Sequence, residues 1–354
     1  MSRLTKTGGE MKPFLKAVTL LSLFTILNSC KSNFVEPEPQ PGRRDYVWKV
    51  DTLETPYDRM GKLWGSSPTD VWRTSDGDWD RSISHFDGEK WSSYGISGLF
   101  NTKAIYGFSY NNVFLGADNG SIWRYDGNNW KLFAGLTKDG HSGIVFDNIW
   151  GESAINFYAL GAYVDENGYA NNAVIAHYYN EKWEMIKTDV LYGIVEHLYK
   201  NFSDNKIYLQ VIGGRNLTDS THIYEYSEGK FLKLYSNIWT QGLQADISLI
   251  NNEVHFVLGN EIAVRRNNKF QTIVNVNNPN FYQRIWGRSS NDIFLLMTDG
   301  LAHYNGSTIE YLFYFNKTPR TQIYGAALFE NDVFFLVDEA PTGLTLIYHG
   351  KLKQ

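Results

Sequence analysis

The densest group of potential metal ligands in the sequence is a run of three aspartates at alternate positions, Asp76, Asp78 and Asp80. Carboxylates at this spacing are typical of a calcium loop, which points several oxygens at one hard cation. The sixth position is Arg81, however, where an EF-hand loop needs glycine. We therefore expect a solvated acidic loop and no cofactor, with calcium as the alternative.

A second set of candidates is aromatic and lies in long segments between predicted strands. These segments are Asp76–Arg81, Gly135–Asp147, Gly161–Asn172, Gly213–Thr221, Asn275–Gln283 and Asp338–Gly343. Aromatic side chains with a few polar partners suit contact with a sugar or a peptide, although the same side chains also serve to cover the end of a fold. The ligand-binding residues that we predict are Tyr163, Tyr169, Arg215, Trp79, Phe281 and Tyr282, with His141 nearby.

No catalytic constellation can be assembled from the sequence. Arg59, Arg284 and Arg320 precede predicted strands, as a carboxylate-binding arginine cluster would, but chance also places arginines there. There is no Gly-x-Ser-x-Gly, His-Glu-x-x-His or phosphate-loop motif. The catalytic residues are therefore unknown. If the protein is an enzyme, we expect two carboxylates, or a carboxylate and arginines, close together at the centre of the loop-bearing face.

The elements that position these residues are set by an internal repeat with two parts. The first part is an aromatic-Gly pair followed, a few residues later, by Asp or Asn, an apolar residue and an aromatic residue. Its copies begin at Leu63, Ile105, Ile149, Ile285 and Ile323. The second part is an aromatic residue (Arg266 in one copy), a polar turn and a final apolar residue. Its copies end at Trp91, Trp130, Trp183, Phe231, Phe270, Ile309 and Leu352.

The spacing of this repeat predicts an all-β fold. The copies recur every 39 to 53 residues, which is the length of a four-stranded antiparallel propeller blade. In the first unit we expect strands at 62–65, 71–74, 82–86 and 91–94, with a hairpin turn at Asp87-Gly88. The chain ends without room for a last outer strand, and the segment that starts at Tyr46 resembles one. We therefore predict a seven-bladed β-propeller over residues 45–354, closed by its N-terminal strand, with six or eight blades as alternatives.

The repeat resembles those of bacterial exported β-propeller lipoproteins, in which an Ile-Trp-Gly-Ser-Ser-x-Asp-Val-Trp element alternates with His-Tyr-Asp-Gly-x-x-Trp. The resemblance covers residues 46–354. The second element is also similar to the Asp-box of sialidase-like propellers, although Asp87 directly precedes Gly88 here. The resemblance implies a propeller, and the motifs themselves are structural turns.

The start of the chain predicts export and a lipid anchor. A basic stretch from Met11 and an apolar run over residues 17–27 lead to Leu27-Asn28-Ser29-Cys30. This resembles a lipobox, so we expect a signal peptide at residues 1–29, of which 1–10 are an over-extended start, and lipidation of Cys30. An ordinary signal peptide is the alternative. Residues 30–44 are rich in proline and predict a flexible tether. By the same resemblance, Ser32 favours the outer membrane of a Gram-negative bacterium, on its cell surface or periplasmic face.

Composition restricts the function. The net charge is −5, so a basic surface for nucleic acid is not expected. Aromatic residues make up 16% of the chain. We predict a monomeric surface lipoprotein that acts as a non-catalytic binding or interaction module for a glycan or a protein. The alternative is a glycan-active enzyme, a glycosidase or lyase, on a propeller scaffold.

Overall fold

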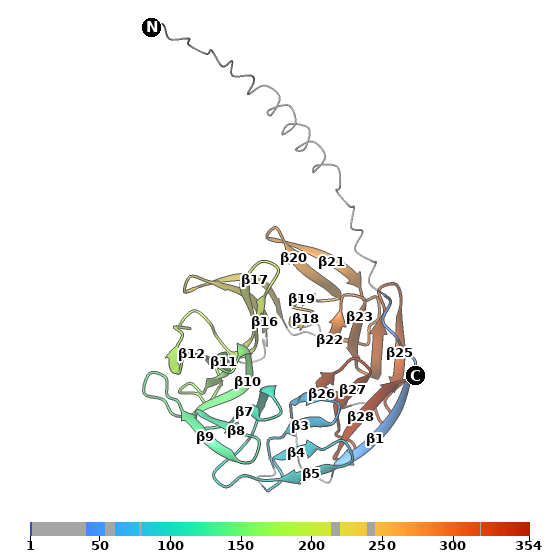
Figure 1. The fold of residues 1–354 in the computed structure, drawn as a ribbon, viewed down its shortest axis with the longest axis horizontal. Helices are drawn as coiled ribbons and strands as arrows, with labels where there is room; N and C mark the ends of the chain where they lie inside the picture. Colours follow the sequence, from blue (N-terminus) through green and yellow to red (C-terminus); the bar gives the residue numbers. More distant parts are fainter. Residues whose placement is uncertain (2–39, 54–60, 78–79, 214–219, 239–244, 319) are drawn as a thin grey trace. The chain divides into compact units, whose positions relative to one another are not determined.

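The protein folds as a ring of seven sheets (Figure 1). The computed structural model describes residues 1, 40–53, 61–77, 80–213, 220–238, 245–318 and 320–354, and residues 41–354 form one compact unit. In this part of the chain, twenty-eight strands form seven antiparallel sheets of four strands each. The predicted seven-bladed propeller is therefore confirmed. The predicted signal peptide, Cys30 and most of the tether lie outside the described residues.

The inner strands, which begin each blade, surround the centre of the ring (Figure 1). They are β2 (Leu63–Ser67), β6 (Ala104–Ser109), β10 (Ile144–Ser153), β14 (Ile194–Asn201), β18 (Ala245–Ile250), β22 (Phe281–Ser289) and β26 (Thr321–Leu328). The second strands are β3 (Asp70–Thr74), β7 (Asn112–Gly116), β11 (Asn156–Tyr163), β15 (Lys206–Gly213), β19 (Glu253–Leu258), β23 (Asp292–Met297) and β27 (Asp332–Glu339).

The third and outer strands complete each blade toward the rim. The third strands are β4 (Ile83–Phe86), β8 (Ser121–Tyr125), β12 (Asn172–Tyr179), β16 (Ser220–Ser227), β20 (Glu261–Arg266), β24 (Gly300–Tyr304) and β28 (Leu344–Leu352). The outer strands are β5 (Trp91–Tyr94), β9 (Trp130–Gly135), β13 (Lys182–Met185), β17 (Lys230–Ile238), β21 (Lys269–Asn275), β25 (Ile309–Tyr314) and β1 (Tyr46–Leu53). Within the described residues no helix has the length and apolar character that a membrane crossing requires.

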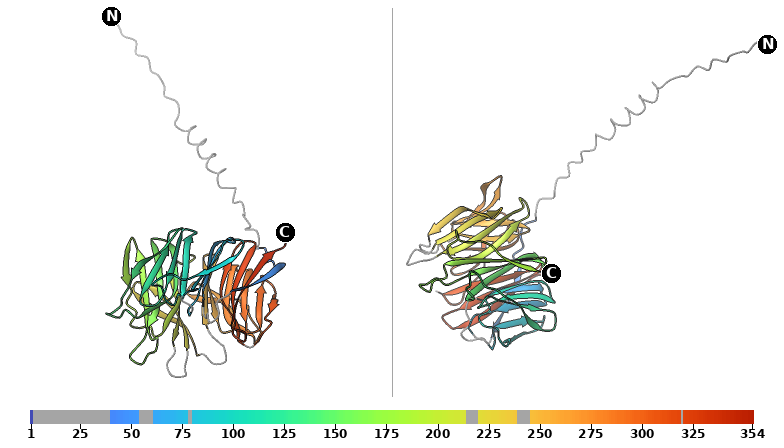
Figure 2. Two further views of the ribbon diagram at one scale, coloured as in Figure 1. Left: turned by 90° about the horizontal axis from the view of Figure 1, so that it is seen from below. Right: turned by 90° about the vertical axis from the view of Figure 1, so that its left-hand side faces the viewer.

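The antiparallel order of the strands gives the ring two different faces (Figure 2). Links between the first and second strands, and between the third and outer strands, open on one face, which we call the turn face. Links between the second and third strands, and from one blade to the next, open on the other, which we call the loop face. The described residues of the six long segments named above lie toward the loop face.

The ring is closed by the first strand of the chain. β1 pairs with β28 along its whole length, from Tyr46 opposite Leu352 to Leu53 opposite Thr345. Arg288 of the preceding blade strengthens this closure, because its Nη2 donates to the Tyr46 hydroxyl at 2.7 Å. The prediction that the N-terminal segment supplies the last outer strand is confirmed.

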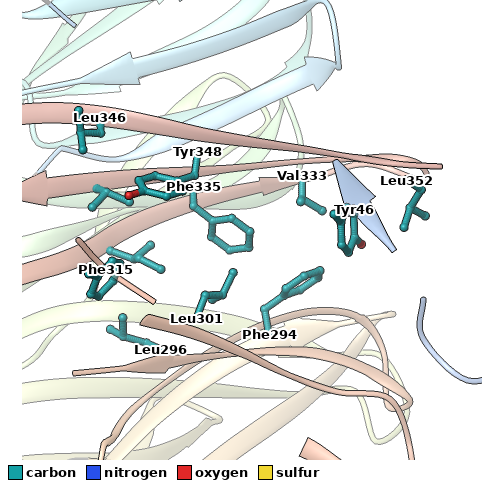
Figure 3. Close-up of a cluster of buried hydrophobic side chains, with 12 residues drawn as sticks. Tyr46, Phe294, Leu296, Leu301, Phe315, Val333, Phe335, Leu346, Tyr348 and Leu352 are labelled. Carbon is teal, nitrogen blue, oxygen red and sulfur yellow. The ribbon is translucent and has the colours of Figure 1, made fainter. Parts of the chain in front are cut away.

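Apolar side chains of neighbouring blades interlock to form the core. Between the last two blades, Phe294 and Leu301 of β23 and β24 meet Phe335 and Tyr348 of β27 and β28 (Figure 3). The second strands are covered on both sides, and β23 is buried along all six residues. This explains why they are continuous apolar runs in the sequence instead of alternating patterns.

The turn-face end of the repeat is held by a recurring polar pair. In six blades, the first residue of the second strand hydrogen-bonds to a side chain of the third strand at 2.7–2.8 Å. The pairs are Asp70–His85, Asn112–Arg124, Asn156–His177, Lys206–Glu225, Asp292–His303 and Asp332–His349. Three imidazoles also stack on the neighbouring aromatic ring, as His85 does on Trp72 with centroids 3.9 Å apart. The two parts of the sequence repeat are thus joined directly.

Candidate functional site at the mouth of the central channel

The aromatic residue of each repeat lines a channel through the ring. Six inner strands contribute one aromatic side chain each to its wall, and these are Trp64, Tyr106, Trp150, Tyr199, Trp286 and Tyr324. Neighbouring blades hold these rings in place. The Trp64 indole lies on Gly107 of the next blade, and the Tyr106 hydroxyl reaches the Gly151 carbonyl of the blade after it at 3.3 Å.

A polar layer lies next to this aromatic layer, toward the loop face. Side chains two residues apart on a strand point the same way, so the residue two positions before each channel residue also faces the channel. In six blades this position is polar, and its occupants are Lys62, Asn148, His197, Asp246, Arg284 and Gln322.

Two bulges add acidic groups to this layer. The pairing of β10 with β11 shifts between Phe146 and Asn148, and the pairing of β14 with β15 shifts between Val195 and His197. The extra residues are Asp147 and Glu196. A bulge changes the direction of a side chain, and both carboxylates line the cavity at the mouth of the channel.

Two ion pairs join different blades: Lys62–Glu196 crosses from the first blade to the fourth, and Arg284–Asp246 joins the neighbouring fifth and sixth blades. Lys62 Nζ lies 2.5 Å from Glu196 Oε1, and Arg284 Nε lies 3.3 Å from Asp246 Oδ2. Arg284 also donates from Nη2 to Nε2 of His197 at 3.1 Å, linking the two halves of the cluster. These five side chains come from four different blades, so the fold itself assembles them.

The environment moves the pKa values of these acids in opposite directions. Burial raises the pKa of Asp147 to about 7, reinforced by the negative charge of Glu196 and opposed by Lys103. Burial also acts to raise the pKa of Glu196, but Lys62 outweighs it and the pKa falls to about 2. Asp246 has a pKa raised by burial to about 6, against the effect of Arg284. Near neutral pH, Glu196 is therefore ionised while Asp147 is partly protonated.

His197 is a neutral member of the cluster. Its burial lowers the imidazole pKa well below the usual value, and the positive charge of Arg284 lowers it further. Since Nε2 accepts from Arg284, a neutral ring carries its proton on Nδ1, where the Tyr199 hydroxyl lies 3.3 Å away and can accept it. This side chain orients Arg284 and adds no charge.

The cluster forms the floor of a cavity of about 310 Å³ that opens on the loop face. Tyr282 and Tyr324 form aromatic parts of its wall. Uncharged polar groups come from Gln210, Thr221 and Gln322. A second cavity of about 230 Å³ continues into the aromatic layer. A cavity with an aromatic wall and several convergent polar groups is suited to a small polar ligand or to the end of a longer chain.

Of the predicted ligand-binding residues, Tyr282 lines this cavity. Phe281 belongs to the hydrophobic core of its blade, with 3% of its surface exposed. It is not among the residues that line the cavity. Trp79 and Arg215 lie outside the described residues.

Tyr163 and Tyr169 lie on another sector of the loop face. The Tyr163 ring stacks on His141 with centroids 4.6 Å apart, which joins two of the long segments, and Tyr169 is 43% exposed. Neither tyrosine is among the residues that line the mouth cavity. Lys138 anchors this sector from inside, donating from Nζ to the Ala173 carbonyl at 2.9 Å.

The acidic run considered for calcium is only partly described, because Asp78 lies outside the described residues. Asp76 is 3.6 Å from Lys103 Nζ at the edge of the mouth, and Asp80 is exposed. Among the residues that the structure describes, no group of three or more histidine, cysteine or acidic side chains is arranged to hold a metal ion.

Arg284 was a candidate from the sequence, but its partners were not. Lys62, His197 and Asp246 occupy equivalent places in their blades, yet differ in residue type, so no motif marks them. A signal did exist: each stands two residues before the channel residue of its inner strand.

Comparison with solved structures supports the fold. A structure of YCF48 bound to D1 peptide has a TM-score of 0.58 at 13% identity, covering 90% of this chain and all of that one. A streptogramin B lyase has a TM-score of 0.60 at 14% identity, covering 87% and 98%. A catalytically inactive virginiamycin B lyase from Staphylococcus aureus, with quinupristin, has a TM-score of 0.60 at 15% identity, covering 87% and 100%. No protein-family model and no curated protein matches the sequence. At these identities the likeness shows the propeller alone, for proteins that include both binders and lyases.

Proposed function

We propose that the protein is a ligand-binding module and that it binds a saccharide at the mouth of the central channel. The observation that carries this proposal is the 310 Å³ cavity, where aromatic and polar side chains from several blades converge. Aromatic faces suit the apolar face of a sugar ring, and the amides and charged groups suit its hydroxyls. A peptide is the alternative ligand, as in the YCF48 structure with its bound peptide.

A second candidate is a glycan-active enzyme, a glycosidase or lyase. It is favoured by the contrast between Asp147, which holds a proton up to about pH 7, and Glu196, which is ionised. Carboxyl groups with separated pKa values are the pairing from which general acids and bases are drawn. The binding module is preferred because Glu196 is already held by Lys62 and Asp246 by Arg284.

The purified protein should be screened on a glycan array and in parallel assayed for glycosidase and lyase turnover. Tyr282→Ala removes aromatic wall and should weaken binding by about 1–2 kcal/mol. Glu89→Gln, on an exposed turn of the opposite face, serves as the matched control and should bind normally. Turnover that Asp147→Asn abolishes would favour the enzyme. Binding that survives Tyr282→Ala unchanged would place the ligand elsewhere.

We also propose that the protein is anchored to the outer membrane of a Gram-negative bacterium through lipid on Cys30. The support is the sequence from Met11 to Cys30, with its basic start, apolar run and terminal cysteine. Cys30→Ala should release the protein from the membrane fraction and abolish labelling by a fatty-acid probe. Unchanged labelling would contradict the anchor.

A further inference from the structure

Lys103 is the cation of the mouth cavity that is held least closely by carboxylates among the described residues. Its side chain is 30% exposed, and its nearest carboxylates, those of Asp76 and Asp147, lie 3.6 and 3.9 Å from Nζ. Both distances exceed a hydrogen bond. Lys62, by contrast, is held at 2.5 Å by Glu196. Lys103 therefore has donors available for an anion in the cavity.

Gln210 is an unsatisfied acceptor in the wall of the same cavity. Its side chain is buried, with 2% exposed, and its Nε2 donates to the Ala245 carbonyl at 2.7 Å. Its Oε1 has no hydrogen-bond partner among the described residues. A buried acceptor without a donor is unfavourable by about 1–3 kcal/mol. Because Oε1 is shielded from solvent, a ligand hydroxyl would relieve this only once the side-chain amide turns toward the cavity.

We infer that the ligand is an acidic saccharide, whose carboxylate binds Lys103 while a hydroxyl donates toward Gln210. This inference rests on the proposed function and narrows its ligand class. An acidic glycan carries both carboxylates and hydroxyls, so one ligand supplies both groups. Tyr282 and Tyr324 offer aromatic surface for the ring itself. An acidic peptide supplies the carboxylate without the hydroxyls.

Asp147 couples this binding to pH. It faces Lys103, Lys62, Glu196 and Asp118, and burial, the largest effect on it, raises its pKa to about 7. An ionised Asp147 would repel a carboxylate bound at Lys103, whereas the protonated acid would not. Affinity for an acidic saccharide should therefore increase as the pH falls from 8 to 6, by up to tenfold per pH unit above the pKa of Asp147.

The test is a calorimetric titration of the full protein at pH 6, 7 and 8. The probes are oligosaccharides of galacturonic, glucuronic and sialic acid, neutral oligosaccharides of the same length, and oligoglutamate. At least one acidic saccharide should bind at least tenfold more tightly than its neutral counterpart at pH 6. Lys103→Met should remove this preference, Lys103→Arg should retain most of it, and Lys131→Met on an outer strand should leave it unchanged.

The variant Asp147→Asn removes the charge of this side chain and keeps its size, so it tests whether the charge causes the pH dependence. This variant should bind the acidic saccharide at pH 8 as tightly as the unaltered protein does at pH 6, with little change between the two. Binding of neutral saccharides without preference for acidic ones would overturn the inference and leave the proposed function standing. Binding of oligoglutamate alone, or of no saccharide, would overturn both. Melting temperatures of each variant show whether it has folded.

Discussion

The indole ring of Trp64 lies on Gly107 of the neighbouring blade, so closely that a Cβ at position 107 would stand 2.4 Å from the ring. Gly107 has an ordinary backbone conformation, since its φ is not in the left-handed region. The glycine is therefore required for space and not for chain flexibility. At the other repeat glycines, Gly65, Gly151, Gly287 and Gly325, an added Cβ would also stand within 3 Å of a neighbouring atom, although that neighbour is not a channel indole.

Replacing Gly107 by alanine should lower the free energy of unfolding by about 1–3 kcal/mol, because the methyl group overpacks the Trp64 ring. Urea denaturation followed by tryptophan fluorescence measures this. Gly135→Ala is the matched control, since nothing lies within 4 Å of its added Cβ and the substitution should be near neutral. Equal effects of the two substitutions would contradict the packing explanation.

The pair Asp292–His303 should make stability depend on pH. The buried His303 donates from Nε2 to Asp292 at 2.7 Å and accepts from Arg44 at Nδ1, which fits a neutral ring. Burial lowers the pKa of His303, and hydrogen bonds from His303 and Arg288 outweigh burial to lower the pKa of Asp292. Both groups thus bind protons less readily in the folded state, so stability is lost as the pH falls.

The unfolding free energy should decrease from about pH 6.5, where unfolded histidine begins to bind protons, to below pH 4, where unfolded aspartate does. Asp292→Asn should destabilise the protein by about 1.5–3 kcal/mol at pH 7 and by less at pH 3. Denaturation curves at several pH values measure both effects. Glu89→Gln is the control, and a penalty for Asp292→Asn that grows toward acid would refute this account.

The fold was predictable because its signals are local. An Asp-Gly turn such as Asp87-Gly88 needs only nearby residues: Gly88 has φ +97°, and the Asp87 carboxylate accepts backbone hydrogen bonds from Glu89 and Lys90. Turns with a positive-φ residue link the third and outer strands of six blades, and in the seventh blade the outer strand is β1. Even the two units without the aromatic-Gly pair, whose inner strands carry Tyr199 and Ser248, form regular blades.

The mouth of the channel was not predictable in the same way. Its charged residues come from separate blades and differ in type, as Lys62 and Asp246 do, so their pairing depends on ring closure. The bulges that direct Asp147 and Glu196 into the cavity are not marked by glycine or proline. The aromatic residues of the long segments were easier to recognise in the sequence than these charged residues. Of those aromatic residues, Tyr282 lines the cavity.

Ring closure should depend on Tyr46. Its ring packs 6.1 Å from Phe294, and its hydroxyl accepts from Arg288 of the preceding blade. Tyr46→Ala should cost about 3–5 kcal/mol and increase proteolysis near the N-terminal strand. Val47→Ala, on the exposed side of the same strand, should be nearly neutral. A stable Tyr46→Ala variant would mean that backbone pairing alone closes the ring.

The aromatic residues of the channel and of the loop face should respond differently to truncation. Trp150 is 5% exposed and meets Tyr199 edge to face at 5.7 Å, so Trp150→Ala should cost about 3–5 kcal/mol of stability. Tyr169 is 43% exposed, and Tyr169→Ala should change stability by less than about 0.5 kcal/mol. If the loop sector contributes to ligand binding, this variant should weaken affinity by about 1–2 kcal/mol. Melting temperature and affinity measured on both variants separate the two roles, and unfolding of Tyr169→Ala with a stable Trp150→Ala would reverse the assignment.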